Sequence, residues 1–336
     1  MPRQQRKIVF FLGAGASVGA GAYALGQGGG RCNIPTQESF WDVFLRFCSS
    51  TNNRKDIQSF LFRYFLGYER VPARLGAMER RQMLQHIDVE EVFTFLSERA
   101  RAPSTSPALR GYAARIWLAL VDEVGNVFRN FEPNVKTRSI YRKFVDQMVR
   151  SRDTVVSFNY DTVFEGSLRA NYEWHYEGID EKTKSVGIIK PHGSVNWEDG
   201  DPVKIKESPD RPLIVAPTHL KFVEISASEG DSSPGYLNHS KPMRNVWAAM
   251  EREMREARAL VFIGYSFPIA DLYFSSVLRS VLADRDGAPG VVIVNPDAVA
   301  IKGRLQGRFA IDRIGMYFDI QNFVRDSRGQ VLALLK

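Results

Sequence analysis

Short runs of consecutive apolar residues, most of them followed by a small polar cluster, mark both ends of this chain. The first run is Ile8–Leu12, and a continuous apolar run of this length is typical of a strand buried on both faces of a parallel sheet. Similar runs recur from residue 154 onward, at Thr154–Phe158, Gly187–Lys190, Leu213–Ala216, Leu260–Ile263 and Val291–Asn295. The pattern predicts a parallel sheet whose first strand lies far from the others in sequence.

The middle of the chain has a helical period instead. Apolar residues recur every three or four positions in two series: Phe40, Phe44 and Phe47, then Ile116, Leu120, Val124, Val127 and Phe131. Two later series predict single helices: Val246, Met250 and Met254, then Phe274, Val277 and Val281. A dense aromatic group is compatible with either a helix core or a protein interface: Phe60, Phe62, Tyr64 and Phe65.

Together these patterns predict an α/β fold, a Rossmann-like parallel sheet with helices on both faces and a large helical insertion. Residues 1–36 and 150–336 would form a discontinuous core, and residues 37–149 an inserted helical subdomain. Polar stretches with Gly, Pro, Ser and Asp predict loops at Gly26–Gly30, Trp197–Pro212 and Glu224–Pro242.

Composition is that of a globular protein and narrows the choice of partners. With 44% hydrophobic and 25% charged residues, the 336-residue chain can bury a large core. Its net charge of +7 favours an anionic partner, either a phosphate-bearing small molecule or a nucleic acid. The 45 Lys and Arg residues are dispersed, so we expect nucleic acid to be involved only indirectly.

Cysteine content and hydropathy argue against a disulfide-rich, zinc-binding, membrane-spanning or secreted protein. Cys32 and Cys48 are the only cysteines, so the chain has neither a disulfide framework nor a four-thiolate zinc site of its own, and we expect no metal. No apolar run approaches the roughly 18 residues of a membrane span. The apolar run after Lys7 is shorter than the roughly 7–15 residues of a secretory signal, which predicts a cytoplasmic protein without membrane contact.

A glycine turn follows the first predicted strand, with the sequence Gly13-Ala14-Gly15-Ala16-Ser17. A strand, a glycine turn and a helix start present backbone N–H groups and a positive helix end to a pyrophosphate. The dinucleotide pattern Gly-x-Gly-x-x-Gly is incomplete because Val18 replaces the third glycine, and no P-loop sequence occurs. The alternative is a tight turn that binds no ligand.

Polar residues follow two further predicted strands. Asn159 and Asp161 place an amide and a carboxylate at one strand end, and His192 follows another. An amide can hold hydroxyl groups or water, and histidine is the usual general base near neutral pH. The alternatives are a turn or helix cap for the first pair and a structural role for the histidine. The other four histidines, His86, His175, His219 and His239, lack such surroundings and are expected to be structural or on the surface.

The last two predicted strands end in similar clusters. Gly264 and Ser266 lie in a glycine turn before a helix, with Asp271 at that helix start, and suit a phosphate or ribose. Asn295 ends the next strand and would face an adenosine. Because ligands bind beyond the carboxyl ends of parallel strands, we expect all these clusters to line one pocket.

In their order along the chain, these motifs resemble those of the sirtuin superfamily. The turn from Gly13 to Ser17 is similar to the family's N-terminal cofactor loop. Pro35 and Thr36 resemble the start of the segment that closes over nicotinamide, although the family's Asp-Phe-Arg does not follow Pro35.

The later motifs resemble the same family. Asn159 and Asp161 match its Asn-x-Asp, and His192 its catalytic His-Gly. Gly264 and Ser266 resemble its Gly-x-Ser turn at the ribose and phosphate, and Asn295 its late asparagine at the adenosine end.

Departures from the family pattern narrow the expected activity. Protein-deacylating sirtuins carry two cysteine pairs after the catalytic histidine, and no cysteine follows Cys48 here. Phe158–Thr162, His192–Trp197 and Asp88–Glu91 look more like bacterial anti-phage sirtuin-like domains, which hydrolyse NAD. The resemblance implies NAD+ as substrate, ADP-ribose and nicotinamide as products, and NAD depletion during infection as the role.

The resemblance also implies residue roles and partners. His192 would activate water directly or through a ribose hydroxyl, Asn159 would position water and ribose, and Asp161 would support the pocket. An unrestrained NAD hydrolase would harm its host, so its activity is expected to be latent. This control would come from self-assembly into a homo-oligomer or from a partner such as a hexameric ATPase translocase or an Argonaute-type protein. Two alternatives stay open: a non-catalytic module that binds NAD or ADP-ribose, and an ADP-ribosyl transferase.

Overall fold

The computed structural model describes residues 7–25, 30–36, 38–169, 171–180, 186–210, 212–216, 241–268, 271–283, 289–309 and 311–333. Several sequence expectations lie outside the described residues: most of the predicted loops at 26–30 and 224–242, and the surroundings of His219 and His239.

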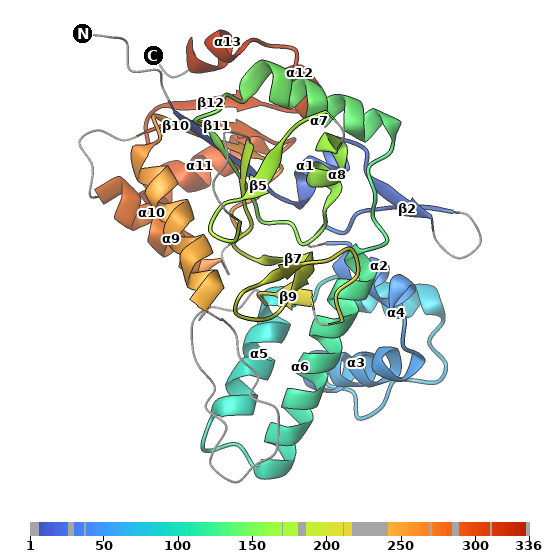
Figure 1. The fold of residues 1–336 in the computed structure, drawn as a ribbon. Coiled ribbons are helices and arrows are strands. Elements are labelled where there is room, and N and C mark those ends of the chain that lie inside the picture. Colours follow the sequence, from blue (N-terminus) through green and yellow to red (C-terminus); the bar gives the residue numbers. More distant parts are fainter. Residues whose placement is uncertain are drawn as a thin grey trace.

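Seven parallel strands form the central sheet. They are β1 (Ile8–Leu12), β4 (Thr154–Ser157), β5 (Trp174–Tyr176), β6 (Val186–Ile189), β10 (Ala259–Ile263), β11 (Gly290–Val294) and β12 (Ile314–Tyr317). Their order across the sheet is β12-β11-β10-β1-β4-β6-β5. Figure 1 shows this sheet with helices around it. The first strand lies in the middle, where Phe10 is in register with Val261 of β10 and Val155 of β4. The predicted parallel sheet is therefore confirmed.

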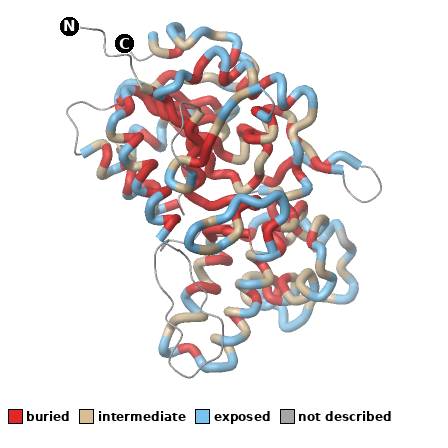
Figure 2. The backbone as a smooth tube through the Cα atoms, in the orientation of Figure 1, coloured by how far each residue is buried: buried red, intermediate tan, exposed pale blue. Residues whose placement is uncertain are grey.

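Helices cover both faces of this sheet, and neighbouring residues of β1 point to opposite faces. Phe10 meets Phe144 of α7 (Val135–Met148) edge-on, with ring centroids 5.1 Å apart. Phe11 meets Phe274 of α10 (Leu272–Ala283) at 5.6 Å on the other face. Because both faces are covered, every residue of β1 is buried, and Figure 2 shows the buried strands at the centre.

Further helices complete each layer. The face of α7 also carries α1 (Ala14–Gly19), α8 (Val163–Leu168) and α12 (Ile320–Phe323), and the face of α10 also carries α9 (Lys241–Glu256) and α11 (Ala298–Phe309). A last helix, α13 (Arg328–Ala333), lies near the C-terminus. None of the helices in the described ranges has both the length and the apolar character needed to cross a bilayer.

The predicted helical insertion is present between the first and second strands of the large sheet. It contains α2 (Phe40–Phe47), α3 (Thr51–Tyr64), α4 (Ala77–Leu84), α5 (Val89–Arg101) and α6 (Pro107–Phe128). Before it, β2 (Tyr23–Leu25) and β3 (Arg31–Asn33) form a hairpin. Phe60 and Phe62 are fully buried and therefore belong to the helix core, whereas Tyr64 and Phe65 are partly buried against the Phe60 ring. The exact domain boundaries stay a prediction.

A second, antiparallel sheet corrects part of the strand prediction. It consists of β7 (Gly193–Glu198), β8 (Lys204–Ile205) and β9 (Pro212–Ile214). The apolar run Leu213–Ala216 therefore does not belong to the parallel sheet, and the stretch predicted as a loop at 197–212 contains the end of β7 and all of β8. Apolar runs alone did not distinguish the two sheets, because β9 is as fully buried as the central strands of the parallel sheet. The edge strands β5 and β12 were missed, since each is short and only partly buried.

The turn after β1 packs directly on the turn after β10. Gly13 N–H donates to the carbonyl of Ile263 at 2.9 Å, and Gly15 N–H donates to that of Gly264 at 3.0 Å. Gly264 has a φ of +63°, and a Cβ there would lie 1.9 Å from the Ala16 nitrogen. Glycine is required at Gly264 both by this conformation and by the close backbone approach.

We expect Gly264→Ala to destabilise the protein by about 3 kcal/mol or more, because the new methyl group overlaps backbone atoms in a left-handed conformation. Gly303→Ala is the matched control. Gly303 lies exposed within α11 and a Cβ there meets nothing within 4 Å, so this change should stabilise by roughly 0.5–1 kcal/mol. Urea denaturation followed by circular dichroism measures both, and similar stabilities for the two variants would contradict the packing argument.

Candidate functional site

One large cavity lies at the carboxyl ends of β1, β4, β10 and β11, with a volume of about 550 Å³. Its wall comes partly from the loops after these strands and partly from the helical insertion. The insertion contributes Phe40, Val89, Glu90, Phe93, Val124 and Phe128. The site is therefore built by the sheet and the inserted helices together.

Most of the residues singled out in the sequence meet at this cavity. Its lining includes Gly13, Ala14, Gly15, Pro35, Thr36, Asn159, Asp161, His192, Gly264, Ser266 and Asn295. Three others are absent from the lining: Ala16, Ser17 and Asp271. Strands that are distant in sequence end side by side in a parallel sheet, which is why these separate motifs converge.

The glycine turn uses most of its own amide groups inside the protein. Besides the two bonds to the β10 turn, Ala16 N–H donates to the carbonyl of Gly13 at 2.9 Å. In the described part of the chain, Ala14 N–H is the turn amide that lacks an acceptor. The glycines therefore allow close packing, and Ala14 is the donor that this turn offers to a ligand.

Asn159 is held in place by the same turn. Its side-chain Nδ2 donates to the carbonyl of Gly13 at 3.1 Å and to Ser17 Oγ at 3.3 Å. Ser17 Oγ in turn lies 3.3 Å from the hydroxyl of Tyr141. Because both amide hydrogens are directed into the protein, Oδ1 is the atom that Asn159 can offer as an acceptor. Ser17 acts behind Asn159 rather than at the cavity surface.

His192 lies between β6 and β7 with its ring among aromatic side chains. Its ring centroid is 5.1 Å from that of Phe158, 6.2 Å from Tyr160 and 6.3 Å from Trp247. Trp247 Nε1 also donates to the carbonyl of Pro191 at 2.9 Å, which fixes the loop just before the histidine. The imidazole is 8% exposed and lines the cavity, so it is packed firmly yet reachable from it.

Asp161 is buried at the base of the site. Its Oδ1 accepts from the backbone N–H of Val163 at 2.9 Å, at the start of α8. Burial raises the pKa of Asp161 from its ordinary 3.8 to about 6, although the Lys190 charge and the Val163 N–H act in the opposite direction.

A buried polar network behind Asp161 was not recognised in the sequence. Lys190 Nζ donates to the carbonyl of Asp161 at 2.5 Å and to Glu165 Oε1 at 2.9 Å, and Lys190 is completely buried. Tyr176 connects Glu165 to Asn196 through its hydroxyl, at 3.2 and 3.3 Å. The members come from separate elements, so no local spacing signals them. Lys190 and Asn196 lie in or beside the motif around His192, but no sequence pattern indicates a role for either of them.

The other end of the cavity is more open. Phe318, which the sequence did not single out, lines the cavity while 54% exposed, and Asp297 lies on the same wall. Asn295 Oδ1 accepts from the Asp297 N–H at 2.9 Å. Asp271 lies behind this wall, where it accepts from the hydroxyl of Tyr265 at 2.6 Å and so holds the turn after β10.

The charged side chains of the described cavity lining are acidic. They are Glu38, Glu90, Asp161, Asp297 and Asp319, and this lining contains no Lys or Arg. An acidic wall of this kind suits a ligand that carries a cationic group. If the ligand also carries phosphates, these must be bound by backbone N–H groups and solvent.

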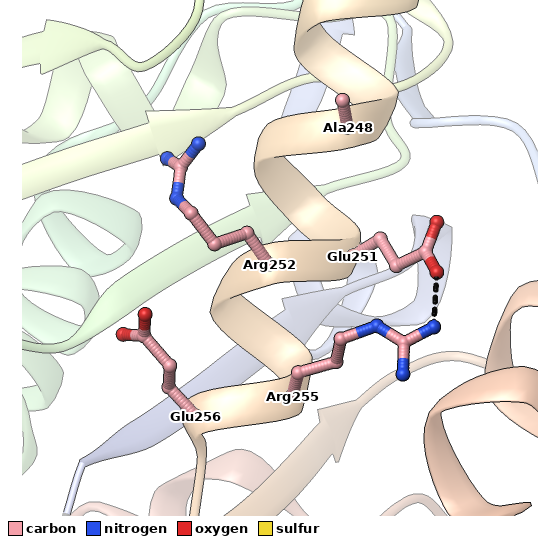
Figure 3. A pocket seen from close by; sticks show the side chains of 5 residues that line it. All are labelled: Ala248, Glu251, Arg252, Arg255 and Glu256. Atoms are coloured by element: carbon pink, nitrogen blue, oxygen red, sulfur yellow. Dashed lines mark hydrogen bonds and ion pairs between the residues drawn. The ribbon is translucent and has the colours of Figure 1, made fainter. Parts of the chain in front are cut away.

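A second hollow, of about 370 Å³, lies on the outer surface of α9 (Figure 3). Its walls are Ala248, Glu251, Arg252, Arg255 and Glu256. Arg255 donates to Glu251 at 2.6 Å and Arg252 to Glu177 at 2.9 Å, so the arginine charges are already paired. This hollow shows no chemistry beyond a charged helix surface.

One comparison with known protein families agrees with the sequence resemblance. Residues 153–310 match the family model of the SIR2-like domain. No curated protein matches the chain. Solved structures that resemble it include a Sir2 homologue serine-to-alanine variant with ADP-ribose, at 15% identity and a TM-score of 0.39, covering 98% of this chain and 92% of that one.

Two other solved structures give similar values. A Sir2 histidine-to-tyrosine variant with a p53 peptide and NAD has 13% identity and a TM-score of 0.37, covering 98% of this chain and 95% of that one. A Sir2 enzyme studied for mechanism and regulation has the same identity and TM-score, with coverages of 99% and 91%.

The raised pKa of Asp161 predicts a specific pH dependence. The folded state favours the protonated acid, so the stability that Asp161 contributes is present below pH 3.8 and is lost as the pH rises through about 6. Asp161→Asn keeps an Oδ1 acceptor without the charge. Relative to the native chain it should gain stability over this pH range, by up to about 3 kcal/mol.

Urea denaturation at intervals from pH 4 to 7.5 measures this difference. Asp312→Asn is the control, because Asp312 is exposed, and it should keep the pH dependence of the native chain. If the free energy of unfolding differed between Asp161→Asn and the native chain by the same amount at every pH, burial would not penalise the charged carboxylate.

Proposed function

Because this chain carries a SIR2-like domain over residues 153–310, we propose that it hydrolyses NAD+ to nicotinamide and ADP-ribose. One observation carries the proposal: the His192 imidazole, the Asn159 amide and the glycine turn line a single cavity. In a parallel sheet this is the place where a dinucleotide binds.

The cavity fits an extended dinucleotide. Its volume of about 550 Å³ lies within the range of roughly 300–1,000 Å³ that is usual for ligand and cofactor sites. The Ala14 N–H lies where it can donate to a pyrophosphate, and apolar residues such as Phe93 and Phe158 surround the rest of the space. His192 and Asn159 would then lie at the nicotinamide ribose, and Asn295 at the adenosine end.

The chemistry needs little beyond these side chains. The bond between the nicotinamide nitrogen and the ribose carbon breaks, its electron pair leaves with nicotinamide, and positive charge develops on the ribose. A water molecule adds to that carbon and its proton passes to His192, directly or through a ribose hydroxyl. Asn159 Oδ1 orients the water or the ribose, and the packed aromatic wall around His192 limits access of other water.

We propose NAD depletion in anti-phage defence as the cellular role. The support is the resemblance of Phe158–Thr162 and His192–Trp197 to bacterial sirtuin-like defence domains. Such an enzyme must be latent, so we also propose control by self-assembly or by a partner such as a hexameric ATPase translocase or an Argonaute-type protein. NAD turnover by the purified chain, measured with and without each candidate, tests this control: equal turnover in all cases contradicts it.

His192→Ala and Asn159→Ala should each lower nicotinamide release by about a hundredfold or more, because each removes a group that acts on the reacting bond. Both chains should still fold, as judged by circular dichroism and the melting temperature. His86→Ala is the control, since His86 is exposed and outside the cavity lining, and it should keep full activity.

Product analysis by mass spectrometry separates the alternatives. Free ADP-ribose and nicotinamide support the hydrolase. Intact NAD that is bound but not cleaved, under every condition tested, indicates a binding module, and a modified macromolecule indicates a transferase. Undiminished nicotinamide release by both variants would overturn the residue assignment.

A further inference from the structure

We propose that Glu90, on the inserted helix α5, is the carboxylate that stabilises the positive charge at the nicotinamide end of the bound dinucleotide. This inference rests on the proposed function and adds a residue from outside the sheet to it. It gives the helical insertion a part in the chemistry as well as in the architecture.

The local structure of α5 brings Glu90 to the cavity. Asp88 caps the helix, its Oδ1 accepting from the Glu90 N–H at 2.8 Å. The first turns of the helix then line the cavity with Val89, Glu90 and Phe93. Phe93 packs edge-on against Trp117 of α6 at 5.2 Å, which fixes α5 along this wall. Glu90 is partly buried, whereas its neighbour Glu91 is exposed.

Glu90 lines the same cavity as His192 and two tyrosines, Tyr160 and Tyr265. Burial is the main reason that the pKa of Tyr160 is raised, and the negative charge of Glu90 raises it further. The pKa of Tyr265 is also raised mainly by burial, with Asp271 and then Glu90 adding to it.

These two tyrosines flank the catalytic candidate. The Tyr160 ring lies 6.2 Å from the His192 ring, and the Tyr265 ring stacks at 4.8 Å on Phe158, which in turn contacts His192. Glu90 thus shares a cavity with His192, and its charge acts on the two tyrosines.

The charge of the ligand explains why a carboxylate is useful there. The nicotinamide ring of NAD+ is cationic, and on cleavage this positive charge moves to the ribose carbon. A nearby carboxylate in a partly buried wall stabilises the cation at both stages. NADH has an uncharged dihydronicotinamide ring, so Glu90 should favour NAD+ over NADH.

The test compares Glu90→Gln with Glu91→Gln, two neighbouring changes that each remove one negative charge from the same helix. The full chain is titrated calorimetrically with carba-NAD+, a cationic analogue whose glycosidic bond does not hydrolyse, and with NADH. We expect the native chain to prefer carba-NAD+, and Glu90→Gln to reduce this preference by about tenfold. Glu91→Gln should leave it within about twofold.

Nicotinamide release supplies a second readout, which should fall by about tenfold or more in Glu90→Gln. Glu90→Asp keeps the charge and should recover part of both effects, which a purely structural role would not produce. Equal weakening of carba-NAD+ and NADH binding by Glu90→Gln, or an unchanged preference, would overturn the inference.

The binding ratio also separates this inference from the proposed function. If the native chain releases no nicotinamide, alone or with any candidate partner, but its preference for carba-NAD+ depends on Glu90, hydrolysis is refuted and the charge role of Glu90 stands. If nicotinamide is released but the preference does not depend on Glu90, hydrolysis stands and the role of Glu90 is refuted. Melting temperatures of all three variants confirm that folded proteins are compared.

Discussion

The site depends on a backbone contact without side chains between the turn after β1 and the turn after β10. Gly15 and Gly264 approach so closely that a Cβ on either would overlap the other's backbone. This contact aligns the ends of the two central strands, and the Asn159 amide is anchored on the same turn through the carbonyl of Gly13. A dinucleotide site at this edge of the sheet requires the two turns to be in this position.

A buried ion pair gives the neighbouring strand ends a similar rigidity. Lys190 holds both the Asp161 carbonyl and the Glu165 carboxylate, and it lies two residues before His192. The loop that carries the amide and carboxylate is thereby tied to the loop that carries the imidazole. Buried charges of this kind are costly to leave unpaired, so the two loops are held in one arrangement. The cavity needs such order, because catalytic groups act only at defined distances.

The inserted helices form the part of the cavity wall that the sheet does not supply. The sheet supplies backbone donors, the amide and the imidazole, whereas α5 closes the cavity with an apolar wall and the Glu90 carboxylate. This arrangement also determines which charges a ligand would meet in the cavity. Phosphates would meet backbone N–H groups and open solvent, and the cationic end of the ligand would meet acidic side chains in a partly buried setting. The overall net charge of +7 therefore does not describe the cavity itself.

The sequence by itself determined the parallel sheet, the buried first strand and the strand-end motifs, because buried strands and glycine turns leave local patterns. It did not separate β9 from the parallel sheet, since a buried strand has the same apolar pattern in either sheet. Tertiary structure alone decided that Ser17 supports Asn159, that Asp271 lies behind the wall, that Lys190 contacts Asp161 and that Glu90 lines the cavity. These roles arise from contacts between elements distant in sequence, and such contacts leave no periodic signal in the chain.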